Sequence, residues 1–178
     1  MAIKATIYKV KLDISDCDRN YFHSHYLTIS CHPSETEQRM MVRLLAFSLF
    51  ASDSLTFTKG LCADDEPELW DKNLIGEIEL WISLGQIDEK QLRKSLGRSK
   101  KVIIFTYAGQ KSSTWWNKNK QQYNQLENLQ IINIKTEDVT AMQDLVSRNM
   151  ALQITIQEGV IWLSDSNQTI SIEPEVLL

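Results

Sequence analysis

The sequence has few cysteines, little net charge and no long apolar run. Its 178 residues include three cysteines, which are widely spaced and contain no CxxC pair: Cys17, Cys31 and Cys62. An odd number at this spacing argues against a disulfide or zinc framework. It predicts reduced thiols in a cytoplasmic protein.

Targeting and membrane signals are also missing. The opening residues, MAIKATIYKVKL, alternate in polarity and carry three lysines, so they lack the continuous apolar core of a signal peptide. No stretch approaches the length of a membrane span, and we expect no membrane partner. The formal net charge of −4 supplies no basic field toward nucleic acid, so nucleic-acid binding would need a local patch.

The composition that remains is that of an ordinary globular protein. Hydrophobic residues make up 43% of the chain and charged residues 24%. The length suits one domain over residues 1–178 with a full hydrophobic core. We find no repeat, low-complexity tract or linker.

Strand and helix signals alternate along this domain. The predicted strands are Ala2–Leu12, His25–Cys31, Leu55–Thr58, Glu77–Leu84, Val102–Tyr107, Leu129–Ile134 and Thr169–Ile172, with a hairpin over Met150–Asp165 that turns at Glu158-Gly159. The predicted helices are Ser34–Phe50, Asp88–Leu96, a helix capped by Ser112 or Ser113 that carries Tyr123, and Thr136–Val146. This order predicts an α/β fold with a mixed central sheet flanked by helices and extra antiparallel strands at both ends.

Two of these helices have specific start signals. Ser34 and Glu37 have the spacing of a capping box, in which the hydroxyl and the carboxylate each satisfy a free backbone amide. Asp88 is a predicted N-cap, and Gly97 ends the helix that follows it.

The acidic segment before and within the predicted strand at Glu77–Leu84 is a candidate cation site. Acidic side chains cluster around Pro67, and the period-2 pattern of the strand places two acids, a Trp and a Ser on one face. The acids are Asp64, Asp65, Glu66 and Glu68, and the strand face carries Glu77, Glu79, Trp81 and Ser83. Mg²⁺ and Ca²⁺ prefer such oxygen ligands. The alternative is a solvated sheet face with an acidic hairpin.

Several long motifs resemble the YaeQ family of bacterial proteins over nearly the whole chain. They are KATIYK, HPSETEQRMMVRLLAF, FTKGLCADDEPELW, LWISLG and LQITIQEGVIWLSD. The resemblance implies a compact variant of the restriction-endonuclease-like PD-(D/E)XK fold. In that architecture an acid, followed by an acid-x-lysine element, cleaves phosphodiesters with Mg²⁺ or Mn²⁺.

The nuclease pattern carries over only in part. Pro67-Glu68 resembles the PD element with Glu in place of Asp, and Glu79 to Gly85 resembles the strand of the second acid. Ser83 stands where the family motif WIELG has Glu, and Gly85 stands where the lysine belongs. A migrated lysine would be Lys94 or, as an alternative, Lys90, and Glu37 matches an acid on the first helix.

The resemblance therefore implies a set of site residues, each with a structural alternative. The implied catalytic residues are Glu37, Glu68, Ser83 and Lys94, and the implied metal ligands are Glu68, Glu79 and Ser83. Glu37 could instead complete the capping box, Glu79 could be an exposed strand acid, and Lys94 a solvated charge. His32, which precedes Pro33, is expected to pack or to be solvated.

Two functions follow as expectations. The first is metal-dependent nucleic-acid processing or binding, in which Trp115 and Trp116 could stack on single-stranded nucleic acid beside Lys111, Lys118 and Lys120. The alternative is a non-catalytic regulatory or interaction protein with an eroded nuclease site and a protein partner. The structural alternative for the two tryptophans is that they divide between the core and the surface.

Overall fold

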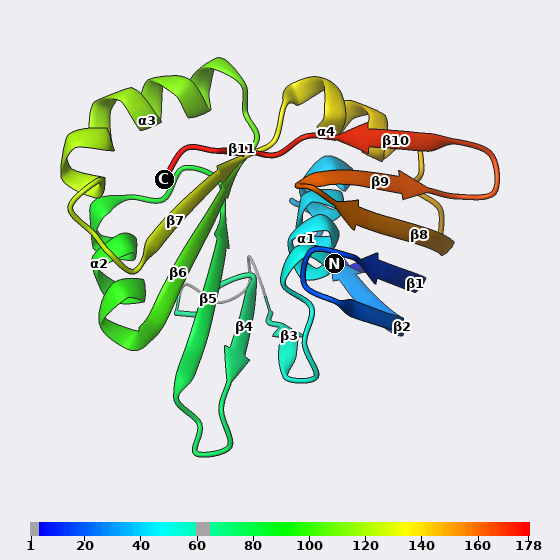
Figure 1. Cartoon of the computed structure of the whole chain (residues 1–178), viewed down its shortest axis with the longest axis horizontal. Coiled ribbons are helices and arrows are strands. Elements are labelled where there is room, and N and C mark those ends of the chain that lie inside the picture. Colours follow the sequence, from blue (N-terminus) through cyan, green and yellow to red (C-terminus); the bar gives the residue numbers. More distant parts are fainter. Residues whose placement is uncertain (1–3, 60–64) are drawn as a thin grey trace. The chain divides into compact units, whose positions relative to one another are not determined.

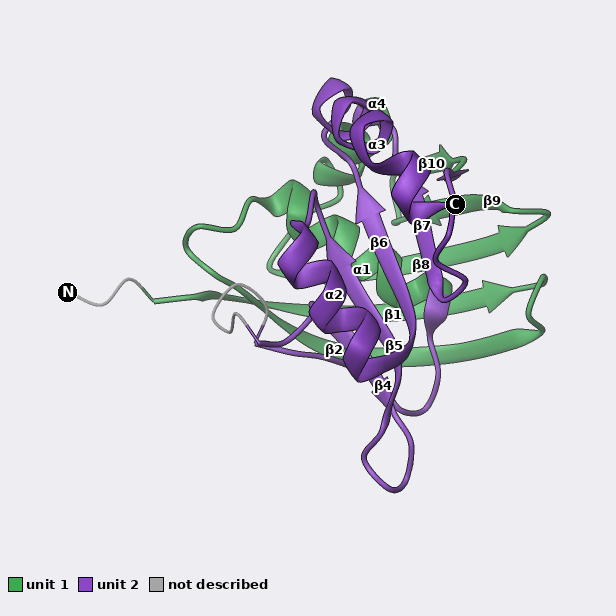
Figure 2. Cartoon of the chain, turned by 90° about the vertical axis from the view of Figure 1, so that its left-hand side faces the viewer, with its two compact units in different colours: residues 1–49, 137–174 green, residues 50–136, 175–178 purple. Residues whose placement is uncertain are grey.

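The structure is a computed structural model that describes residues 4–59 and 65–178. The described residues form four helices and eleven strands (Figure 1). They divide into two compact units, which Figure 2 colours separately. Residues 1–49 and 137–174 make up the first unit, and residues 50–136 and 175–178 make up the second.

The first unit contains a five-stranded mixed sheet in the order β10-β9-β8-β1-β2. Its strands are β1 (Thr6–Asp16), β2 (Tyr21–Cys31), β8 (Asn149–Gln157), β9 (Val160–Ser164) and β10 (Thr169–Ile172). Neighbouring strands are antiparallel except β1 and β8, which are parallel. The unit also holds most of α1 (Glu37–Phe50) and of α4 (Thr136–Gln143).

The second unit contains a six-stranded mixed sheet in the order β11-β7-β6-β5-β4-β3. Its strands are β3 (Leu55–Phe57), β4 (Leu69–Lys72), β5 (Ile78–Leu84), β6 (Ser99–Thr106), β7 (Leu129–Asn133) and β11 (Glu175–Val176). Strands β5, β6 and β7 are parallel, and α2 (Glu89–Arg98) and α3 (Gln110–Tyr123) connect them in turn (Figure 1). Crossover helices of this kind are required because parallel neighbours cannot be joined by a tight turn.

The core of the second unit lies between this sheet and its two helices. Val102 and Ile104, two residues apart in β6, face Leu92 of α2 and Tyr123 of α3, and Trp81 of β5 joins the same cluster. Residues 102–105 of β6 have no exposed surface, which confirms the predicted central strand buried on both faces.

Several local predictions are confirmed. Asp88 caps α2 through a capping box with Gln91, in which each side chain accepts a hydrogen bond from the backbone amide of the other residue. The β8–β9 hairpin turns at Glu158 and Gly159, which have φ of 53° and 76°. Such paired positive φ angles match the right-handed twist of a tight hairpin.

Two predicted helix starts are wrong. Helix α1 begins at Glu37, and the Thr36 hydroxyl accepts a hydrogen bond from the Arg39 amide. Ser34 is therefore not the cap, because its hydroxyl bonds to Nδ1 of His32. Helix α3 begins after Gly109 without a side-chain cap, and the Ser112 hydroxyl instead accepts hydrogen bonds from the Ala108 amide and from Gln86.

The sheet arrangement also differs from the prediction. The α/β fold is confirmed, but the strands form two mixed sheets instead of one central sheet with extra strands at both ends. The reason is the long-range pairing of β1 with β8, which begins at Lys9 and Asn149 and joins the N-terminal hairpin to strands β8, β9 and β10 in a separate sheet.

The predicted free thiols are confirmed where the structure describes them. Cys17 is exposed and free, and Cys31 is buried and free. Burial, followed by the nearby Glu35 carboxylate, raises the pKa of the Cys31 thiol above its ordinary value. Cys62 lies outside the described residues.

Candidate functional site

Glu68, which directly precedes β4, lies opposite Ser83 near the carboxyl end of the neighbouring strand β5. Leu69 pairs with Ile82, and the Glu68 amide donates to the Ile82 carbonyl at 3.0 Å, so the next position along places Glu68 opposite Ser83. Directly opposite residues share a face, with Cβ atoms about 4.5–5.5 Å apart. The backbone thus brings together the first acid of the nuclease pattern and the position of the second.

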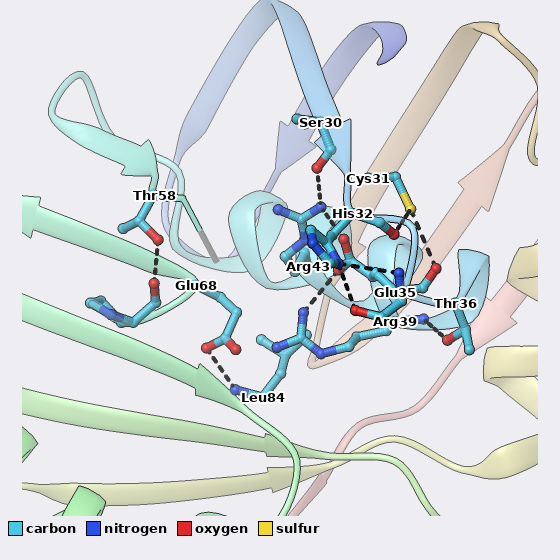
Figure 3. Close-up of polar contacts among 12 residues, drawn as sticks. Ser30, Cys31, His32, Glu35, Thr36, Arg39, Arg43, Thr58, Glu68 and Leu84 are labelled. Carbon is cyan, nitrogen blue, oxygen red and sulfur yellow. Dashed lines mark hydrogen bonds and ion pairs between the residues drawn. The ribbon is translucent and has the colours of Figure 1, made fainter. Parts of the chain in front are cut away.

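The Glu68 carboxylate has a structural partner at this end of the sheet. It accepts a hydrogen bond from the Leu84 amide at 3.1 Å (Figure 3). Strand β4 starts at Leu69, so Leu84 has no opposite residue in β4 to bond. Glu68 thereby satisfies a backbone donor at the end of the β4–β5 ladder.

Ser83 is a buried residue that bonds to a side chain of the core. Its side chain is buried, and its hydroxyl accepts a hydrogen bond from Nε1 of Trp81 at 3.0 Å. The two residues are two apart in β5 and share a face, as the period-2 pattern predicted. The hydroxyl gives the buried indole donor its partner, which a core tryptophan requires.

Glu79 does not join Glu68 and Ser83. Its carboxylate accepts hydrogen bonds from Asn73 at 2.8 Å and from Nζ of Lys100 at 2.7 Å. The Lys100 bond is the main reason that the pKa of Glu79 is lowered. Four residues of strand separate Glu79 from Ser83, a span of about 13 Å. One ion cannot bridge that distance.

Lys94 contacts Asp65, one of the acids that cluster around Pro67. Lys94, on α2, forms an ion pair with Asp65, and Arg98 of the same helix donates to the Asp65 carbonyl at 2.9 Å. Asp64 lies outside the described residues. Lys90, the alternative lysine, is exposed on α2.

Gly85, at the position of the pattern's lysine, has a φ of +90°. Residues with a Cβ adopt this conformation only with strain, so a lysine could not be introduced here without cost. The Gly85 amide donates to the Phe105 carbonyl at 2.8 Å, which holds the end of β5 against β6.

Glu37 lies in the first unit, where its carboxylate contacts two other elements. It accepts hydrogen bonds from the Tyr8 hydroxyl of β1 at 3.2 Å and from Gln143 of α4 at 3.4 Å. The predicted capping box with Ser34 is therefore wrong. Burial, and then the hydrogen bond to Glu37, raise the pKa of Tyr8 above its ordinary value of 10.0.

The raised pKa of Tyr8 predicts a loss of stability in alkali. In the unfolded chain the tyrosine ionises at lower pH than in the folded protein, so its contribution is complete below pH 10 and is lost as the pH rises through the folded-state pKa. We expect Tyr8→Phe to flatten the alkaline decline in the free energy of unfolding. Denaturant melts from about pH 8 to about pH 11 measure this slope.

The start of the pH range supplies the control for this prediction. At about pH 8 Tyr8 is protonated in both the folded and the unfolded protein, so Tyr8→Phe and wild type should share the same slope there and diverge only as the pH approaches 10 and above. An identical slope in Tyr8→Phe and wild type over the whole range would contradict the expected role of Tyr8. The pKa of Tyr123 is also raised by burial, so part of the decline should remain in Tyr8→Phe.

Sequence reasoning missed a buried ionic cluster in the first unit (Figure 3). Glu35 bonds to Arg39 through one carboxylate oxygen and to Arg43 through the other, each at 2.8 Å. Arg43 also donates to the Ser30 carbonyl at 2.9 Å. The signal was the spacing, because residues four and eight after Glu35 return to one helix face.

The two tryptophans of α3 pack toward the core. Nε1 of Trp115 donates to the Ile87 carbonyl at 3.1 Å, and its ring contacts Tyr123 edge-on. Trp116 also packs against the buried cluster around Val102. Each ring is partly buried, so the pair does not form an open stacking platform.

Within residues 4–59 and 65–178, no group of three or more His, Cys, Asp or Glu residues is placed to hold a metal ion. In the same ranges no helix is long and apolar enough to cross a membrane.

Comparisons with known proteins identify the family. A family model described as YaeQ protein matches residues 1–174. The chain belongs to the YaeQ family. It is 44% identical over 172 residues to "Uncharacterized protein YaeQ" of Escherichia coli (strain K12), which covers 97% of this chain and 95% of that protein. The protein of the same name from Salmonella typhi is 41% identical over 173 residues, covering 97% of this chain and 96% of that protein.

Two crystal structures of YaeQ proteins share the fold. The protein from Xanthomonas axonopodis pv. citri matches with a TM-score of 0.95 and 41% identity, covering 98% of each chain. The protein from Pseudomonas syringae matches with a TM-score of 0.92 and 30% identity, covering 98% of this chain and 96% of that one. The YaeQ assignment predicted from the sequence motifs is confirmed.

Proposed function

We propose that this YaeQ-family chain is a non-catalytic interaction or regulatory protein, built on a nuclease-like fold whose metal site has eroded. The observation that carries the proposal is the Ser83 hydroxyl. It stands where the pattern has an acid, is buried, and bonds to the Trp81 indole. A hydroxyl in that role contributes packing and hydrogen bonding to the core without supplying the charge that a metal site needs.

The surrounding residues support the same proposal. Lys94 pairs with Asp65, and Gly85 has a backbone conformation that disfavours lysine. Phosphodiester cleavage needs a cation to balance charge on the scissile phosphate and oxygen ligands for the ion. Among the acids of the nuclease pattern in the described part of the chain, Glu68 is the one that brings a carboxylate to this end of the sheet, so this donor set fits Mg²⁺ or Mn²⁺ poorly.

Metal-dependent nucleic-acid processing is the second candidate, and one observation favours it. The Glu68 carboxylate lies at the carboxyl end of parallel strands, where open α/β sheets commonly bind ligands. If Glu68 still held an ion there, Mg²⁺ or Mn²⁺ would be a resident cofactor, and water molecules would complete its coordination.

Thermal melts with added metal separate the two candidates. A ligand present at a hundred times its dissociation constant stabilises the folded state by about 2.7 kcal/mol. For an eroded site we expect millimolar Mg²⁺ or Mn²⁺ to leave the melting temperature unchanged in wild type and in Glu68→Gln. A rise in wild type that disappears in Glu68→Gln would overturn the proposal and support the metal-dependent candidate. Chelator at matched ionic strength is the control.

A further inference from the structure

Strand β2 is a long edge strand with none of the usual protection. It is the outermost strand of the row β10-β9-β8-β1-β2 (Figure 1). Its 11 residues, YFHSHYLTISC, pair with β1 in unbroken register from Tyr21 to Cys31. The sequence of β2 contains no Pro, Lys, Arg, Asp or Glu, the residues that commonly prevent an edge from pairing further.

The direction of the free backbone groups follows from two contacts. The Lys9 amide donates to the Arg148 carbonyl just before β8, so odd-numbered residues of β1 direct their backbone groups toward β8. Even-numbered residues of β1 then face β2, and Tyr8 pairs with Ile29. The odd-numbered residues of β2 therefore direct their backbone amides and carbonyls toward β1. Because these groups alternate sides along a strand, those of the even-numbered residues of β2 point away from β1 at the edge of the sheet. The Arg43 bond to the Ser30 carbonyl agrees with this direction.

Four residues therefore present an open row of amides and carbonyls. They are Phe22, Ser24, Tyr26 and Thr28, all exposed. Across the described ranges, 4–59 and 65–178, the outward backbone groups of these four residues make no hydrogen bond with the protein. The side chains of Phe22 and Tyr26 are 59% and 80% exposed on the same face of the strand.

We propose that β2 pairs antiparallel with β2 of a second copy of this chain, with the two-fold axis at Ser24. Phe22, Ser24 and Tyr26 would each exchange two backbone hydrogen bonds with the residue opposite, whereas Thr28 would lie opposite Asn20, which precedes β2. This register pairs Phe22 with Tyr26 of the second copy, and the symmetry makes the same aromatic pair twice.

The properties of β2 favour a second copy as the occupant. An identical strand in antiparallel orientation is self-complementary in hydrogen bonding about a two-fold axis. The absence of Lys, Arg, Asp and Glu from Tyr21–Cys31 means that two copies meet without like-charge repulsion. The pairing uses no residue of the Glu68–Ser83 region, so its failure would leave the proposed function unaffected.

The test compares two substitutions at Ser24. Both remove the hydrogen bond from Ser24 to Asp13, but only Ser24→Pro removes the outward amide, while Ser24→Ala keeps it. That amide makes no bond to β1, so proline is tolerated at this edge position. We expect wild type and Ser24→Ala to sediment with twice the mass of one chain, and Ser24→Pro to sediment with the mass of one chain.

A second variant keeps the test decisive if Ser24→Pro fails to fold. Tyr26→Lys replaces an exposed side chain and places a positive charge in each half of the interface, so it should also sediment as one chain. A wild type that is monomeric at every concentration would overturn the proposal and leave an extended segment of another protein as the occupant. A Ser24→Pro dimer as stable as that of Ser24→Ala would overturn it as well.

Discussion

Glu35→Gln is expected to lower the free energy of unfolding by about 3–5 kcal/mol. Glu35 is the common partner of Arg39 and Arg43, and the side chains of Glu35 and Arg43 are only 3% and 4% exposed. Gln keeps the shape of Glu but removes its charge. Arg43 would then be a buried cation without this charged partner, which is the costly way to break a buried ion pair.

Glu89→Gln is the matched control for this prediction. Glu89 also pairs with an arginine four residues away, Arg93, but the two side chains are 56% and 76% exposed. Exposed pairs of this kind contribute little, so the change should stay within about 0.5 kcal/mol. Urea melts of wild type, Glu35→Gln and Glu89→Gln measure the two changes in the free energy of unfolding. If both variants lost the same small amount, the cluster around Glu35 would behave as a surface ion pair.

Ser83→Glu is expected to have two effects of opposite sign. Without metal it should lower the free energy of unfolding by about 2–4 kcal/mol, because a carboxylate enters a buried position beside Glu68. With Mn²⁺ it should gain affinity that wild type lacks, because two carboxylates would then lie opposite one another. Denaturant melts in chelator and calorimetric titration with Mn²⁺ measure the two effects.

Ser83→Ala separates the effect of adding a carboxylate from the effect of losing the hydroxyl. It leaves the Trp81 indole without its acceptor and should cost about 1–3 kcal/mol, with no gain in metal affinity. Adding Glu68→Gln to Ser83→Glu should abolish the gained affinity. Neutral stability and flat titrations in Ser83→Glu would contradict both the buried environment of Ser83 and its position opposite Glu68.

The sequence by itself determined the features whose causes lie within a few residues. The Asp88–Gln91 capping box joins residues three apart, and the hairpin at Glu158-Gly159 joins adjacent ones. The apolar run of β6 predicted its burial because a strand covered on both faces has no position for a polar side chain. Local hydrogen bonding and burial suffice to predict such elements.

Helix starts show where local signals become ambiguous. Ser34 and Thr36 are both good N-cap residues, and the choice between them depends on which partners surround the turn. His32 bonds to Ser34, and Glu37 reaches Tyr8 and Gln143. Gln143 is 106 residues away in the sequence. A spacing rule over three residues cannot include such a contact.

Only the tertiary structure decided which chemical groups meet. The period-2 pattern correctly placed Trp81 and Ser83 on one strand face, but it did not reveal that Glu79 bonds to Lys100. The opposition of Glu68 and Ser83 depends on the β4–β5 register, and the two-sheet arrangement depends on β1 pairing with β8. Strand pairing of this kind is selected by the burial of whole faces across long sequence separations. The residue pattern along the chain specifies those faces but not their partners.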